Sequence, residues 1–185
     1  MPMRGESAWV AALESAWVEN QGAACTTAAV LAALGALGAR GLPELGAATL
    51  LLGARVPFGA PALLDYVALP GRRPPLDRRI EALAGRHGLR VTSHTAVVAR
   101  PRALVPSHDE MVVANLGWGQ EEPGRWGSWG FHPALPGTWS TGGHSVVLAQ
   151  VLEDRGWLVL DPNHRGLQRW PRPGRAVTAT RISLA

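Results

Sequence analysis

The stretch "TGGHSVVLAQVLEDRGWLVLDPN", residues 141–163, predicts a β-hairpin. Two apolar runs flank a polar segment, Glu153 to Gly156, whose composition is typical of a tight turn. His144 opens the first run and Asp161 closes the second. Because strand side chains alternate between the two faces of a sheet, the expected pairing puts both residues on one face. The hairpin therefore brings an imidazole and a carboxyl group to the same side of a sheet.

The register of this hairpin leaves the partner of the histidine open. The expected turn pairs Leu152 with Trp157 and sets Asp161 opposite Leu148. Asn163 then lies nearer to the histidine, while twist or a bulge would bring Asp161 closer. Either residue could orient the imidazole.

The rest of the chain predicts helices first and strands afterwards, which is typical of an α+β fold with an antiparallel sheet. We expect one domain, residues 1–185, with an N-terminal helical arm at 1–22 and a loop rich in Trp and Gly at 117–143. The expected helices cover about 25–40, a segment after Pro43, 60–69 and 75–88, and further strands cover 89–98, 110–118 and 176–185. In the arm, Trp9 and Trp17 are expected on one helical face. The Ala-rich helix is expected to be buried all round, with Gly35 and Gly38 allowing close neighbours.

The loop at 117–143 precedes the histidine and is expected to lack secondary structure. Loops of that length in a small domain are usually functional. Trp126, Trp129 and Trp139 are expected to line a substrate groove, or alternatively to pack the loop onto the body.

Composition argues for a globular protein, since 46% of the 185 residues are hydrophobic and 17% are charged. All eighteen basic residues are Arg and the net charge is +4. The arginines at 72, 73, 78 and 79 lack interleaved aromatics, so we expect a solvated surface and no nucleic-acid partner. No segment resembles a secretory signal or is apolar enough to cross a membrane. We expect a cytoplasmic protein that contacts no membrane and uses no metal or other cofactor, its histidines lacking metal-ligand spacing.

Cys25 is the only cysteine and stands at the start of the Ala-rich helix. Backbone N–H groups at a helix start, together with the helix dipole, stabilise a thiolate there. The alternative is that Cys25 is an inert small hydrophobe in the core.

The order of these motifs resembles that of the papain-like cysteine peptidases. The helix-start cysteine, "GGHSVVLAQV" and "GWLVLDP" are most similar to the branch that cleaves double-glycine leader peptides. The resemblance implies a papain-like fold, with Cys25 as nucleophile, His144 as base and Asp161 as orienting acid. The implied activity is hydrolysis of a peptide or amide. Transfer of the acyl group to an amine, and a non-catalytic peptide-binding module, are the alternatives.

Two positions depart from the pattern of that family. Thr26 follows the cysteine where the family usually has Gly. Glu19 stands where the family places the Gln of the oxyanion hole, and an ionised carboxylate would repel the developing negative charge. We therefore expect Gln21 to supply the donor through a shortened turn, with a protonated Glu19 as the alternative.

Overall fold

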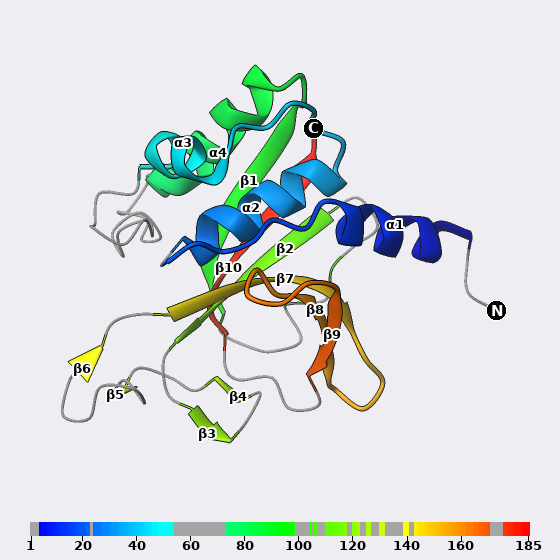
Figure 1. Cartoon of the computed structure of the whole chain (residues 1–185), viewed down its shortest axis with the longest axis vertical. Coiled ribbons are helices and arrows are strands. Elements are labelled where there is room, and N and C mark those ends of the chain that lie inside the picture. Colours follow the sequence, from blue (N-terminus) through cyan, green and yellow to red (C-terminus); the bar gives the residue numbers. More distant parts are fainter. Residues whose placement is uncertain are drawn as a thin grey trace.

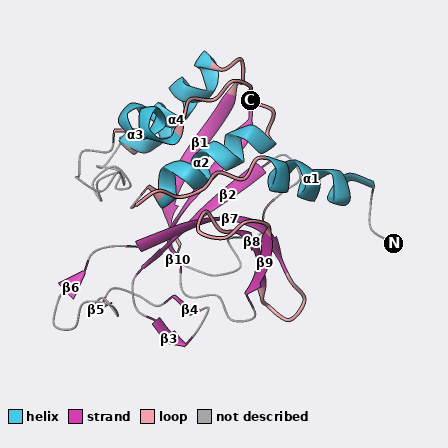
Figure 2. Cartoon of the chain, viewed as in Figure 1, coloured by secondary structure: helices cyan, strands magenta, loops and turns pink. Residues whose placement is uncertain are grey.

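The computed structural model describes residues 4–22, 24–53, 73–98, 104, 106, 110–117, 120–122, 125–126, 130–131, 139–140, 143–170 and 176–185. Within these residues the chain forms four helices and a six-stranded antiparallel sheet, so the predicted α+β class is confirmed (Figures 1 and 2). The predicted helix at 60–69 lies outside the described residues.

The helices are α1 (Arg4–Ser15), α2 (Cys25–Ala36), α3 (Leu45–Leu51) and α4 (Pro75–Arg86). The prediction for α2 is confirmed, since residues 25–34 are all buried. The helix predicted at 75–88 corresponds to α4, whose apolar stripe of Leu76, Ile80, Leu83 and Ala84 is buried. Gly88 follows the helix with φ +76°, a conformation that glycine adopts without strain. The Ala-rich and amphipathic patterns were therefore sufficient to locate these two helices.

The N-terminal arm differs in part from the prediction. Helix α1 ends at Ser15, so Trp17 lies beyond the helix rather than on one face with Trp9. Both indoles nevertheless pack against the core. Gly35 lies against the end of the arm, because a Cβ there would come 3.1 Å from the Cβ of Ala16. Gly38 does not serve such an approach, since a Cβ there would meet nothing within 4 Å.

The main sheet has the order β1-β10-β2-β7-β8-β9, and every neighbouring pair is antiparallel. Its strands are β1 (Val91–Val97), β2 (Glu110–Gly117), β7 (Gly143–Val151), β8 (Trp157–Leu160), β9 (Leu167–Trp170) and β10 (Ala176–Leu184). Strand β10 therefore lies between β1 and β2, although it follows all the others in the chain.

Core residues occupy both faces of this sheet. On one face α2 packs over β7 and β2, and α4 packs over β1 (Figure 1). Val113, Val147, Leu160 and Ile182 belong to this core. The neighbouring strand positions contribute to a second cluster that includes Val112, Ala114, Val146, Leu148 and Val159. The side chains of 111–114 in β2 and of 144–148 in β7 are all buried, so both faces of these strands lie in the core there, which explains the apolar runs within them.

The β7–β8 hairpin forms as predicted, but in a different register. Val151, not Leu152, pairs with Trp157, because the turn closes with the Leu152 N–H donating to the Gly156 carbonyl at 2.8 Å. A bulge between Leu148 and Gln150 then shifts the pairing once more, so that Leu148 pairs with Val159. Both shifts move the end of β8 toward the start of β7. Continued beyond β8, this register brings Asp161 level with Val146 rather than Leu148.

The loop at 117–143 was predicted to lack secondary structure, and this is wrong for its described residues. They form four short strands: β3 (Gln120–Glu122), β4 (Arg125–Trp126), β5 (Gly130–Phe131) and β6 (Trp139–Ser140). Strand β3 pairs with β4, and β5 pairs with β6, each pair forming a separate two-stranded sheet. The many Gly and Pro residues of this segment obscured so short a pattern of pairing.

Candidate active site

Cys25 is the first residue of α2, the helix that packs over β7. The preceding residue, Ala24, forms no side-chain cap of the helix, and the backbone N–H of Thr26 in the first turn bonds the thiol. Only 7% of Cys25 is exposed, and its thiol forms a hydrogen bond with His144. The helix start and the histidine strand thus meet at the sulfur.

His144 connects the cysteine to a buried carboxylate. Its Nε2 atom lies 2.8 Å from Oδ1 of Asp161, and each of the two residues is only 4% exposed. Because Nε2 is engaged there, Nδ1 is the ring nitrogen left for the thiol. The backbone N–H of Asn163 donates to the same Asp161 oxygen at 2.8 Å, and its side-chain Oδ1 accepts from Asn20. The sequence left Asp161 and Asn163 open, and Asp161 is the residue that binds the histidine.

The electrostatics favour a charged thiolate–imidazolium pair. Burial alone would raise the pKa of the Cys25 thiol, but the hydrogen bond and positive charge of His144 outweigh it, with the backbone N–H groups of Ser145 and Thr26 also contributing. The pKa of Cys25 is consequently lowered. Burial likewise opposes the charge on His144, yet hydrogen bonds and charge from Asp161 and Cys25 raise its pKa to about 9. Near neutral pH the proton therefore resides on the imidazole.

Asp161 itself is held as an anion. Burial opposes its ionisation, but the hydrogen bond and charge of His144 and the N–H of Asn163 lower its pKa. One oxygen, Oδ1, accepts both of these bonds. A carboxylate fixed in this way holds the ring of His144 in one orientation and one tautomer.

Two residues that the sequence did not place at the site, Trp17 and Asn20, fix the turn that carries the acid. The Trp17 indole Nε1–H donates to the Asp161 carbonyl at 2.9 Å, and the Asn20 backbone N–H donates to the Pro162 carbonyl at 2.8 Å. The Asn20 side chain adds a 2.8 Å bond from Nδ2 to Oδ1 of Asn163. The segment before the nucleophile helix is thus joined to the acid turn. The polar run "ENQG" was the only signal in the sequence, and it indicated no partner.

The residues predicted for the oxyanion hole lie at the surface. Glu19 and Gln21 are both exposed, and no hydrogen bond recorded among the described residues joins either side chain to Cys25. Asn20, between them, donates from Nδ2 to the Gly22 carbonyl at 3.0 Å and to Asn163. Both of its amide protons are used, which leaves none for an oxyanion. The roles of Gln21 and Glu19 remain predictions.

The tryptophans predicted to line a substrate groove are only partly described. Trp126 lies in β4 and Trp139 lies in β6, but their side chains are outside the description. Trp129 lies outside the described residues altogether. Whether these indoles line a groove or pack the loop onto the body stays a prediction.

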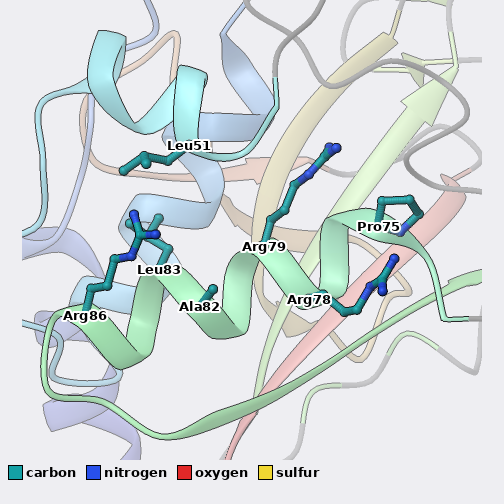
Figure 3. A pocket seen from close by; sticks show the side chains of 7 residues that line it. All are labelled: Leu51, Pro75, Arg78, Arg79, Ala82, Leu83 and Arg86. Atoms are coloured by element: carbon teal, nitrogen blue, oxygen red, sulfur yellow. The ribbon is translucent and has the colours of Figure 1, made fainter.

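A separate cavity of about 400 Å³ lies between α3 and α4 (Figure 3). It is lined by Leu51, Pro75, Arg78, Arg79, Ala82, Leu83 and Arg86. Figure 3 shows the three guanidinium groups spread apart along α4 rather than turned toward one point. Arg79 donates to the carbonyl of Leu52 at 3.1 Å, and Arg73, outside the cavity, bonds Glu81 and the Ser93 carbonyl. Two arginines of the predicted solvated cluster therefore bind other parts of the protein.

Among the described residues, no group of three or more His, Cys, Asp or Glu could hold a metal ion. None of the described helices is long and apolar enough to cross a membrane. No protein-family model, curated protein or solved structure matches the chain.

Proposed function

We propose that this chain is a thiol-dependent hydrolase with a papain-like fold, acting on a peptide or amide through Cys25, His144 and Asp161. One observation carries the proposal: the hydrogen-bonded series from thiol to imidazole to carboxylate at the start of a buried helix. A lowered cysteine pKa beside a raised histidine pKa is the combination that nucleophilic thiol catalysis requires.

The geometry gives each residue one task. The Cys25 thiolate attacks the carbonyl carbon, and its electron pair forms the carbon–sulfur bond of a tetrahedral intermediate. Collapse of that intermediate breaks the bond to the amine, which leaves with the proton held by His144. Water then attacks the thioester while His144 takes a proton, and the acid product and the thiol are released. Asp161 stabilises the imidazolium before the amine leaves and again after water is deprotonated, and it orients the neutral ring in between.

The arrangement of elements supports the papain-like assignment. A cysteine begins a helix that packs on an antiparallel sheet, and much later the histidine lies on β7 and the acid directly follows the neighbouring strand β8. The family resemblance of "GGHSVVLAQV" and "GWLVLDP" rests on the two residues that contact each other at 2.8 Å. Because the thioester could be opened by an amine as readily as by water, acyl transfer is included in the same chemistry.

The burial of the site favours a second candidate, a papain-like module that binds a peptide without turnover. Cys25 is 7% exposed and His144 is 4% exposed, which restricts the approach of a carbonyl group to the sulfur. A binding module would keep the fold and the buried pair but form no thioester.

The deciding experiment follows alkylation of Cys25 by iodoacetamide across pH, in the wild type and in His144→Ala. We expect a thiol pKa below the ordinary value of about 8.5 in the wild type and loss of that depression in the variant. Mass spectrometry after incubation with p-nitrophenyl acetate should detect an acyl group on Cys25. An ordinary thiol pKa in both proteins contradicts the hydrolase, and a lowered pKa without any acyl-enzyme favours the binding module.

A further inference from the structure

Thr26, the residue that departs from the family pattern, lies directly beside the candidate nucleophile and is buried. Its hydroxyl Oγ1 lies 2.8 Å from Oγ of Ser145, which follows His144 in the chain and is also buried. The residue after the thiol and the residue after the imidazole are therefore hydrogen-bonded to each other. This bond connects the first turn of α2 to the start of β7.

The direction of this bond follows from the next contact. Ser145 Oγ donates to the amide oxygen Oδ1 of Asn115 at 2.7 Å, and an amide oxygen can only accept. The single hydroxyl proton of Ser145 is thus committed, so Thr26 donates and Ser145 accepts. Asn115 in turn donates from Nδ2 to Thr178 at 3.0 Å. One directional series runs from α2 through β7 and β2 to β10.

The same serine also acts on the sulfur through its backbone. The N–H groups of Ser145 and Thr26 both contribute to the lowered pKa of Cys25. Ser145 is therefore held on its side chain by Thr26 and Asn115 while its N–H faces the thiol.

Thr27, the next residue of the helix, provides a comparison for the Thr26 hydroxyl. Thr27 is fully buried, and its hydroxyl has no hydrogen-bond partner within the described part of the chain. The start of α2 therefore tolerates a buried, unpaired hydroxyl. Pairing at Thr26 is a specific contact with the histidine strand.

On the basis of the proposed function, we propose that Thr26 and Ser145 are positioning residues that fix the Cys25 sulfur against the His144 imidazole. Neither hydroxyl takes part in bond making. Their hydrogen bond holds the helix start and the histidine strand in the one arrangement in which the thiol and the ring nitrogen meet. Small displacements of reacting groups cost large factors in rate.

The test compares Thr26→Val with Thr27→Val, the same substitution at adjacent buried positions. For each we would measure the pH dependence of Cys25 alkylation, the acylation rate with p-nitrophenyl acetate, and thermal unfolding. Thr26→Val should raise the thiol pKa and slow acylation about 10- to 100-fold. Thr27→Val should change neither, because it removes a hydroxyl that makes no bond. Thr26→Ser, which keeps the donor, should restore the wild-type titration.

Ser145→Ala removes the acceptor of the same hydrogen bond. It replaces Thr26→Val in the test if the Thr26→Val protein does not fold. A Thr26→Val protein that unfolds earlier but titrates and acylates like Thr27→Val would overturn the positioning role. Failure of the proposed function has a different signature, because the wild-type thiol would then show an ordinary pKa that His144→Ala does not change.

Discussion

Two buried carboxylates in this protein serve different purposes. Asp77, near the start of α4, is fully buried and accepts hydrogen bonds from Ser93 Oγ at 3.0 Å, Thr95 Oγ1 at 2.6 Å and Thr95 N at 3.0 Å. These donors are hydroxyl and amide groups that do not titrate near neutral pH. Asp161 instead accepts from His144, an imidazole that contacts a thiol. The first carboxylate joins a helix to a strand, and the second is, in the proposed mechanism, part of a proton-transfer series.

The comparison shows that burial and saturation with hydrogen bonds do not by themselves mark a functional acid. What separates the two is the nature of the donor. A donor that loses its proton at accessible pH allows the carboxylate to assist proton transfer. A donor that keeps its proton allows the carboxylate to contribute only to the stability of the fold. The predictions below are ordered by the size of the expected effect.

Removal of the Asp161 carboxylate should have the largest effect on catalysis. In Asp161→Ala the imidazolium loses its partner and its fixed tautomer, so acylation should slow by about 10²- to 10⁴-fold. The measurement is the acylation rate with p-nitrophenyl acetate, corrected for folded protein. Asp77→Ala is the matched control, and its folded fraction should react at nearly the wild-type rate. Equal losses of acylation rate in Asp161→Ala and Asp77→Ala would show that the two carboxylates do not differ in function.

Gln21 and Glu19 give the next largest effect. If Gln21 supplies the oxyanion donor, Gln21→Ala should lower turnover about 10²- to 10³-fold, while Glu19→Gln should preserve or raise it. Steady-state kinetics on any confirmed substrate measure both variants. The reverse pattern would assign the donor to a protonated Glu19, and no effect from either would place the hole elsewhere.

Asp77→Ala should chiefly affect stability. The substitution leaves the Ser93 and Thr95 donors buried without their acceptor, which should lower the free energy of unfolding by about 3 kcal/mol. Urea denaturation followed by tryptophan fluorescence measures the change. The midpoint of Cys25 alkylation should stay where it is in the wild type, and a shift of that midpoint would connect Asp77 to the site.

The pH dependence gives the smallest but most specific effect. His144 loses its proton as the pH rises through about 9, so the rate of cleavage of an amide substrate, whose leaving amine needs that proton, should fall on the alkaline side. The raised pKa also stabilises the fold below the unfolded value of 6.5, and this contribution disappears as the pH rises through about 9. The lowered pKa of Cys25 acts in the opposite sense, because its contribution is lost as the pH falls.

A pair of amide substitutions checks this assignment. Asp161→Asn should move the alkaline limb of the rate profile to lower pH by about one unit or more, since the charge that holds the proton on His144 is gone. Asp77→Asn should leave the limb unchanged. A limb that stays near pH 9 in Asp161→Asn would show that another group controls it.

Local patterns in the sequence predicted much of this fold and the three residues at the centre of the site. The Ala-rich run located α2, the apolar stripe located α4, and alternation along the hairpin put His144 and Asp161 on one face. These features depend on neighbours in the chain, so periodicity reveals them.

Features that depend on distant contacts could not be predicted in this way. The position of β10 between β1 and β2 depends on pairing with strands that lie far away in the sequence, and the residues around Leu148 carry no signal for the bulge that follows it. The contacts of Trp17, Asn20 and Thr26 are one or two hydrogen bonds each to residues far along the chain. The hydrogen-bond partner of an indole N–H or a hydroxyl cannot be predicted from a periodic pattern in the sequence.

The position of β10 has a consequence for biosynthesis. A ribosome delivers Cys25 and α2 early, the histidine strand much later, and the strand that joins β1 to β2 after both. Until the hairpin emerges, the nascent thiol has neither the imidazole nor the Ser145 N–H that lower its pKa. Long-range pairing of this kind forms late in folding. The thiolate that the proposed mechanism requires can therefore form only after most of the chain has been synthesised.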